Sequence, residues 1–126
     1  MRVLLDTAVL IFSVEAPERL SRRAYEALKG AEDIREFSSV SISEIAIKNM
    51  LGKLKMPAET VRQAMQDMMV RVLPFTAEHA YRLFELPLHH HDPFDRQIIA
   101  QALCENIPLI TSDKKFSLYR GLKVIW

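Results

Sequence analysis

Short apolar runs alternate with amphipathic segments along the whole chain, and this alternation constrains the fold more than any other feature of the sequence. The runs have the length of buried strands, and most of them end at a polar residue or a proline. They lie at residues 2–5, 37–42, 70–73, 108–111 and 122–126. Strands that alternate with helices form a parallel sheet covered by helices. The sequence therefore predicts an α/β fold with a short-stranded, mostly parallel central sheet.

The segments between the runs have the apolar spacing of helices. They lie at residues 8–14, 18–29, 41–52, 58–70, 76–84 and 92–106. Gly30 marks the end of the second helix, and Ser41 is expected to cap the third, with Glu44 completing a capping box. No linker, repeat or low-complexity stretch interrupts the pattern, and 126 residues suffice for one hydrophobic core. Residues 1–126 are therefore expected to form a single domain.

The helix expected at residues 92–106 places an acid on a buried face. Asp92 suits the N-cap, Pro93 suits the first helical position, and Asp95 then falls at the third. The apolar side chains that follow Asp95 share its helix face, and they are Ile98, Ile99, Ala102 and Leu103. Because an isolated buried carboxylate is unfavourable, Asp95 is expected to have a partner.

Three further acids fall at the same predicted edge of the sheet. Asp6 follows the first strand and Asp113 follows the fourth, and ligands of open parallel sheets bind beyond the carboxyl ends of the strands. Glu44 is expected in the first turn of a helix that begins at that edge. Asp95 comes after a loop, but its helix leads straight into the fourth strand. One edge is therefore expected to gather four acids.

Each of these acids has an ordinary structural explanation when it is taken alone, as a helix cap or a turn residue. As a set without a matching arginine, four carboxylates would repel one another and raise their pKa values. A divalent cation removes that repulsion. Carboxylate oxygens suit Mg²⁺ or Mn²⁺, which also reach phosphate oxygens. The set therefore predicts a metal site that activates a water beside a phosphodiester.

Several neighbours of the acids are candidates for accessory roles. The hydroxyls of Thr7 and Thr111 suit either a carboxylate or metal-bound water, or the backbone at a strand end. Asp92 suits a helix cap better than a fifth acid. Arg96 is expected to point away from the apolar stripe or across the rim of the crevice. Lys48 lies near the same edge, where a nucleic-acid backbone or solvent explains it equally well.

The histidines and the cysteine are given ordinary roles. Adjacent histidines in a loop rarely point to one centre, so residues 89–91 are expected to form a solvated loop at the mouth of the site. His79 is expected on a helix surface. Cys104, the single cysteine, is expected to be a small buried apolar residue. One cysteine forms no internal disulfide, which fits a reducing compartment.

Charge and hydropathy set few limits on function. The formal net charge of +1 neither excludes nor indicates a nucleic-acid or protein partner. The apolar run at the N-terminus is too short for a signal peptide or a membrane span. A cytoplasmic protein without membrane association is therefore expected.

Seven stretches of the chain together carry a family resemblance, and they keep the family's order over nearly the whole sequence. They are Leu4-Leu5-Asp6-Thr7, Ser41-Ile42-Ser43-Glu44-Ile45-Ala46-Ile47-Lys48, Leu51-Gly52-Lys53-Leu54, His91-Asp92-Pro93-Phe94-Asp95-Arg96, Ile99-Ala100-Gln101-Ala102, Leu109-Ile110-Thr111-Ser112-Asp113 and Val124-Ile125-Trp126. The chain resembles the PIN domain family, and specifically the VapC-type ribonuclease toxins of type II toxin–antitoxin systems. The Asp-Pro-Phe-Asp-Arg run with Thr-x-Asp downstream is its most specific part.

The resemblance implies a three-layer α/β/α sandwich and a metal-dependent endoribonuclease. It also implies a homodimer and an antitoxin whose tail covers the active site. Ala8 and Ser43 stand where close relatives often carry His and Trp, and neither position is a metal ligand. The family's acidic positions, which would hold one or two Mg²⁺ or Mn²⁺ ions, map onto Asp6, Glu44, Asp95 and Asp113.

Two rival interpretations stay open. One is a binding module that keeps the fold and sequesters RNA or a protein without cutting it, although every expected acid is present. The other is a DNA-directed or general phosphodiesterase, because a carboxylate–metal site recognises the phosphate and the motifs do not separate RNA from DNA. In the metal-dependent interpretations, Ser112 and Cys104 are expected to be dispensable for the chemistry.

Overall fold

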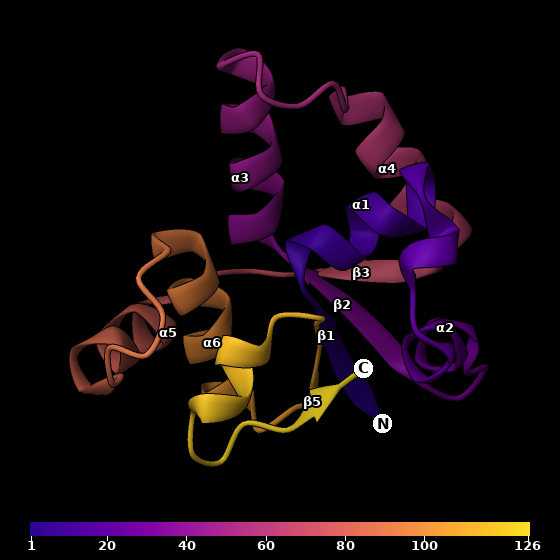
Figure 1. Ribbon diagram of the computed structural model, residues 1–126. Coiled ribbons are helices and arrows are strands. Elements are labelled where there is room, and N and C mark those ends of the chain that lie inside the picture. The colour runs from indigo at the N-terminus through magenta and orange to yellow at the C-terminus, as the bar shows by residue number, and fades with distance from the viewer.

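A five-stranded sheet with every neighbouring pair parallel forms the centre of the computed structural model, which describes residues 1–126 (Figure 1). The strand order is β3-β2-β1-β4-β5. The strands are β1 (Arg2–Leu5), β2 (Ile34–Ser38), β3 (Val70–Leu73), β4 (Leu109–Ile110) and β5 (Val124–Ile125). The predicted α/β fold with a parallel sheet is confirmed.

Helices cover both faces of this sheet. They are α1 (Thr7–Glu15), α2 (Arg22–Lys29), α3 (Ser39–Met50), α4 (Ala58–Asp67), α5 (Ala77–Arg82) and α6 (Pro93–Glu105), with 3₁₀ turns at Pro17–Arg19, Leu83–Glu85 and Lys114–Leu118. Helices α1, α2 and α4 pack on one face, and α6 packs on the other with α5 beside it (Figure 1). None of the helices has the length and apolar character that a membrane span needs.

Alternation along the strands divides the core into two layers. Val3 and Leu5 of β1 belong to the cluster shared with α1, α2 and α4, whereas Leu4 between them belongs to the cluster shared with α6. Leu109 and Ile110 of β4 divide in the same way. Successive side chains of a strand point to opposite faces, so these short strands are buried on both sides. The three-layer arrangement is therefore confirmed.

The order of the strands reverses at β1. From β1 the chain passes to β2 and β3 on one side, and later to β4 and β5 on the other. Helices that leave neighbouring strands toward opposite sides open a crevice beyond their carboxyl ends. Asp6 directly follows β1, and Asp113 lies three residues beyond β4. Both acids therefore lie at the position where such sheets bind ligands.

The second strand lies earlier in the chain than predicted. Strand β2 pairs with β1 from Ile34 onward and ends at Ser38. The apolar pattern missed its start because the charged residues Arg35 and Glu36 are buried in the sheet. Helix α3 then begins at Ser39, and the Ser38 side chain accepts the Val40 N–H. The predicted capping box of Ser41 and Glu44 is therefore wrong.

Of the other predicted helix boundaries, some are confirmed and some are wrong. The helix predicted at residues 18–29 is a 3₁₀ turn followed by α2, whose first turn is capped by Ser21. The predicted end of this helix at Gly30 is confirmed. Helix α6 is confirmed, with Asp92 as its N-cap and Asn106 at φ 53° in the left-handed region at its end.

The ordinary roles given to His79 and Cys104 are both wrong. His79 is 2% exposed, since α5 packs against α6, and its Nε2 lies 3.0 Å from Glu105 Oε2. Its Nδ1 accepts the Thr76 N–H in a capping box. Cys104 is exposed, because nine residues after Asp95 a helix presents the face opposite the buried stripe.

Candidate functional site

A single open pocket at the carboxyl edge of the sheet contains all four predicted acids. Its volume is about 310 Å³. It is lined by Asp6, Thr7, Ala8, Ile11, Glu44, Lys48, Asp92, Asp95, Ser112 and Asp113. The predicted convergence of the acids is therefore present in the structure. We call this hollow the acid pocket.

Asp6 lies at the end of β1, where the chain turns into α1. It occupies the N-cap position of α1, but its side chain makes no capping hydrogen bond. Instead, its Oδ2 accepts a hydrogen bond of 2.7 Å from the Thr111 hydroxyl. Burial raises the pKa of Asp6 to about 6, and the negative charge of Glu44 adds to this effect. The helix-cap explanation of Asp6 therefore fails, and Thr111 orients the carboxylate.

Glu44 reaches the acid pocket from the second turn of α3, because that helix begins five residues before it. The prediction that it lies in the first turn is wrong. Its Oε2 accepts a hydrogen bond of 2.6 Å from Lys48 Nζ, one turn further along the helix. Its Oε1 is buried and has no hydrogen-bond partner. A buried carboxylate oxygen without a donor is unfavourable, so this atom is available to a cation.

Asp95 lies in the first turn of α6, as predicted. The Asp92 side chain accepts the N–H groups of Phe94 and Asp95, which fixes the start of the helix. Ile98 and Ile99 follow on the same buried face. Burial, together with the negative charges of Asp6, Asp92, Glu44 and Asp113, raises the pKa of Asp95 to about 8. The carboxylate therefore lies at the end of an apolar stripe among like charges.

Asp113 is held by the turn after β4 and by a histidine. Its Oδ1 accepts the Lys115 N–H at 2.9 Å, and its own N–H donates to the Thr111 hydroxyl. Its Oδ2 lies 2.9 Å from His90 Nε2, and the same nitrogen lies 3.0 Å from Asp95 Oδ2. His90 is 7% exposed. The prediction of a solvated loop is therefore wrong for His90, which was not predicted to contact the acids of the site.

The other accessory candidates have mainly structural contacts. The Thr7 hydroxyl donates to Ser41 Oγ and joins the starts of α1 and α3. Asp92 caps α6 and also lines the acid pocket. Arg96 donates to the backbone carbonyls of Leu86, Pro87 and His90, so it stabilises the histidine loop and does not extend across the rim of the pocket.

The acid pocket has the donor set of a divalent-cation site. Five carboxylates, those of the four predicted acids and of the capping Asp92, face one lysine, Lys48, and one histidine, His90. A ring nitrogen of His90 and one carboxylate oxygen each of Asp95 and Asp113 lie within 4.8 Å of one another. The unpartnered oxygen of Glu44 is a hard ligand in the same pocket. Carboxylate oxygens in this number fit Mg²⁺ or Mn²⁺.

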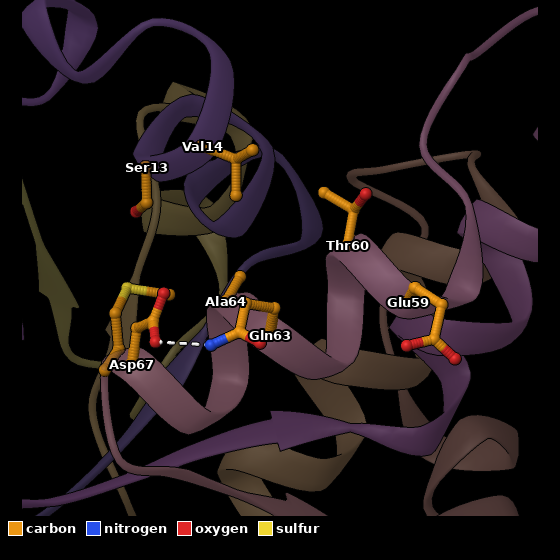
Figure 2. A pocket seen from close by; sticks show the side chains of 8 residues that line it. Ser13, Val14, Glu59, Thr60, Gln63, Ala64 and Asp67 are labelled. Carbon is orange, nitrogen blue, oxygen red and sulfur yellow. Dashed lines mark hydrogen bonds between the residues drawn. The ribbon is translucent and has the colours of Figure 1, made fainter.

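A larger hollow of about 540 Å³ lies between α1 and α4, away from the acids (Figure 2). Ser13 and Val14 line it from α1, and Glu59, Gln63 and Asp67 line it from α4 (Figure 2). Gln63 and Asp67 are exposed and bond to each other along one helix turn. Because its polar groups are solvated or paired, this hollow lacks the unsatisfied charge of the acid pocket.

Comparison with known proteins assigns a family. The family model described as PIN domain matches residues 3–122. The comparison with curated proteins finds no matching sequence.

Solved structures share the fold at low sequence identity. VapBC2 from Rickettsia felis bound to a DNA fragment from its promoter is similar, with a TM-score of 0.74, 19% identity and coverage of 98% of this chain and 97% of that chain. DNA-bound VapBC from Salmonella typhimurium gives a TM-score of 0.72, 15% identity and coverage of 98% and 96%. A toxin–antitoxin complex from Klebsiella pneumoniae gives a TM-score of 0.65, 21% identity and coverage of 95% and 94%.

Proposed function

The chain belongs to the PIN domain family, and on that premise we propose that it is a metal-dependent endoribonuclease, the VapC-type toxin of a toxin–antitoxin pair. One observation carries the proposal. The four predicted carboxylates and that of Asp92 line one pocket, and the buried oxygen of Glu44 lacks any protein partner. A pocket that gathers like charge without enough counter-charge fits a cation and the phosphate that a cation recognises.

The residues that would hold Mg²⁺ or Mn²⁺ are Asp6, Glu44, Asp95 and Asp113. A bound ion of this kind supplies a water of lowered pKa and neutralises charge that develops on a phosphodiester. The chain's own residues prepare the site for it. Thr111 orients Asp6, and Asp92 fixes the helix turn that carries Asp95. No protein nucleophile is needed, so Ser112 and Cys104 are dispensable in this mechanism.

The toxin assignment rests on the similar solved complexes and on the motifs of the sequence. One chain in each of the VapBC complexes from Rickettsia felis and Salmonella typhimurium shares the fold over nearly its full length. We therefore propose an antitoxin protein as the partner, RNA as the substrate, a homodimer as the assembly and the cytoplasm as the location. Residues 1–126 would act as one nuclease domain.

A cleavage assay tests this function. The purified, antitoxin-free chain is incubated with total cellular RNA and Mg²⁺ or Mn²⁺, beside an Asp95→Asn variant. Asp67→Asn is the matched control, because Asp67 is exposed and lies on α4. Asp95→Asn is expected to cut about 10³-fold more slowly, since several kcal/mol of charge stabilisation are removed and each 1.4 kcal/mol is tenfold in rate.

The same assay separates the rival functions. The proposal predicts that a chelator stops cleavage and that Asp67→Asn cuts like the wild type. Equal cleavage by the wild type and Asp95→Asn would contradict it, as would a wild type that cuts no RNA. Preferential cleavage of single-stranded DNA would instead identify a DNA-directed phosphodiesterase. A separate test in cells addresses the other rival: growth arrest that persists when Asp95→Asn is induced would identify a binding module.

A further inference from the structure

We propose that His90 is a positioning residue, whose Nε2–H holds the carboxylate of Asp113 beside that of Asp95 for a cation without binding the cation itself. The inference deepens the proposed function and rests on it. It starts from the geometry of the loop before α6, where His90 Nε2 lies 2.9 Å from Asp113 Oδ2 and 3.0 Å from Asp95 Oδ2.

The other nitrogen of the ring decides where the hydrogen lies. His90 Nδ1 lies 3.2 Å from the backbone N–H of Asp92 and accepts a hydrogen bond from it. A nitrogen that accepts carries no hydrogen, so the hydrogen of the neutral ring is on Nε2. Nε2 therefore donates toward the carboxylates. To bind a metal through Nε2, the ring would have to move its hydrogen to Nδ1, directly against the Asp92 N–H.

The loop is built to hold this ring in place. The His90 N–H donates to the Tyr119 hydroxyl at 2.8 Å, and Arg96 donates to the His90 carbonyl at 3.2 Å. Phe116 contacts the ring edge to face, with centroids 5.5 Å apart. His89 and His91, by contrast, are exposed. His89 contacts the Tyr119 ring edge to face but stays exposed, so only the middle one of the three adjacent histidines is buried and held by hydrogen bonds.

The position between two acids explains what the ring does. The Asp113 carboxylate, which follows β4, and the Asp95 carboxylate, which lies on α6, both approach His90 Nε2. The Nε2–H bonds to Asp113 and lies against Asp95, so it counters the repulsion between the two carboxylates and sets the direction of Asp113. A group that hydrogen-bonds a metal-ligating carboxylate in this way tunes affinity by orienting the ligand. His90 therefore acts on the cation through Asp113, with Asp95 held beside it.

The first experiment measures the affinity for Mn²⁺ alone by calorimetry on the antitoxin-free chain. His90→Ala is expected to bind Mn²⁺ about 10- to 100-fold more weakly, as is typical for loss of a group that orients metal ligands. His90→Gln is expected to recover most of the affinity, because the glutamine amide N–H reaches the place of Nε2. His91→Ala is the matched control and is expected to bind like the wild type.

Each outcome decides a different claim. A wild type that binds no Mn²⁺ contradicts the proposed function itself. A wild type that binds Mn²⁺ while His90→Ala binds equally well overturns the role of His90 alone. His90→Gln that binds as weakly as a folded His90→Ala also overturns it, because a donor at that place is then not what matters.

A second experiment needs no variant and therefore does not depend on the folding of His90→Ala. Long-range ¹H–¹⁵N NMR reports which ring nitrogen carries the hydrogen, and Mg²⁺ is diamagnetic. The expected result is the Nε2–H form of His90 both without Mg²⁺ and with it. The Nδ1–H form in the presence of Mg²⁺ would make Nε2 a metal ligand and would overturn the proposal.

Discussion

Two groups of acids in this molecule differ in how their charge is balanced. In the first, Glu36 of β2 accepts from Arg2 and Arg71, and Glu105 of α6 accepts from Arg2 and His79. In the second, the acids of the acid pocket face only Lys48 and His90. We call the first group the matched cluster.

The pKa values follow this difference. The His79 hydrogen bond, together with Arg2, holds the pKa of Glu105 below its usual value. Burial and like charge raise the pKa of Asp95 to about 8. Charged groups that satisfy one another stabilise the fold, whereas raised carboxylate pKa values in a pocket are typical of functional sites. The matched cluster is therefore structural, and the acid pocket is held together at the expense of stability.

The largest effect is expected for Asp6→Asn, which should lower the rate of RNA cleavage without lowering the stability of the fold. Asp6→Asn is expected to slow RNA cleavage about 10³-fold, or about 4 kcal/mol, because a ligand charge is lost. The free energy of unfolding of the metal-free chain at pH 8 is expected to stay equal or rise, since the amide oxygen still accepts from Thr111 and one repelling charge is gone. Cleavage rates and urea unfolding measure the two effects. A parallel loss of both would contradict the comparison.

A pH titration of stability gives the next effect. A carboxylate with a raised folded-state pKa stabilises the protein at low pH, and that stability is lost as the pH rises through the folded-state value. For Asp95, metal-free stability is therefore expected to fall by about 2 kcal/mol between pH 6 and pH 8. Saturating Mg²⁺ or Asp95→Asn should flatten this slope. Urea unfolding at each pH provides the measurement, and a metal-free stability that rises over this interval would contradict the assignment.

In the matched cluster, stability is expected to change with pH in the opposite direction. The lowered pKa of Glu105 contributes stability above the unfolded-state value that is lost as the pH falls through the folded-state value. Glu105→Gln should therefore remove part of the stability at neutral pH and weaken its loss in acid. Unfolding curves below pH 5 test this contrast.

Glu36→Gln is expected to affect stability without affecting the site. It leaves Arg2 and Arg71 without their shared carboxylate, and loss of such charged hydrogen bonds costs about 1.5 kcal/mol here, because both arginines are partly exposed. Mn²⁺ affinity should not change. A changed affinity with intact folding would show that the two clusters are coupled.

The smallest effect is expected at Lys48, whose side chain is 41% exposed. The pair with Glu44 along α3 is worth about 0.5 kcal/mol. Lys48→Gln should therefore hardly change stability, and it should tighten Mn²⁺ binding a few-fold, because Glu44 then has no competing cation. Calorimetry with Mn²⁺ checks the direction, and weaker binding would assign Lys48 a different role.

The sequence was sufficient to predict the positions of those acids that follow a strand or begin a helix. Asp6, Asp95 and Asp113 each take their place from a neighbouring element whose type was evident from apolar spacing. Glu44 was placed at the right edge for a wrong reason. Its helix starts earlier than predicted, and the helix phase, set by packing of α3, turns Glu44 toward the pocket.

Most of the remaining errors have one physical source, which is pairing between residues distant in the sequence, whereas Cys104 is exposed because of the phase of α6 alone. The charged residues Arg35 and Glu36 hid the start of β2 from the apolar pattern. They are compatible with a buried strand only because partners far along the chain pair with them. His79 is buried for the same reason. His90 could not be distinguished from His89 and His91, since its contacts with Tyr119 and Asp113 come from the far side of α6 in the sequence.

The most direct test of the central claim is a calorimetric titration with Mn²⁺ at pH 8. It is carried out on the antitoxin-free wild type, Asp95→Asn and Glu36→Gln. The unmatched charge of the acid pocket predicts that the wild type and Glu36→Gln bind Mn²⁺ alike and that Asp95→Asn loses the binding. Unchanged binding in Asp95→Asn, or no binding in the wild type, would contradict it.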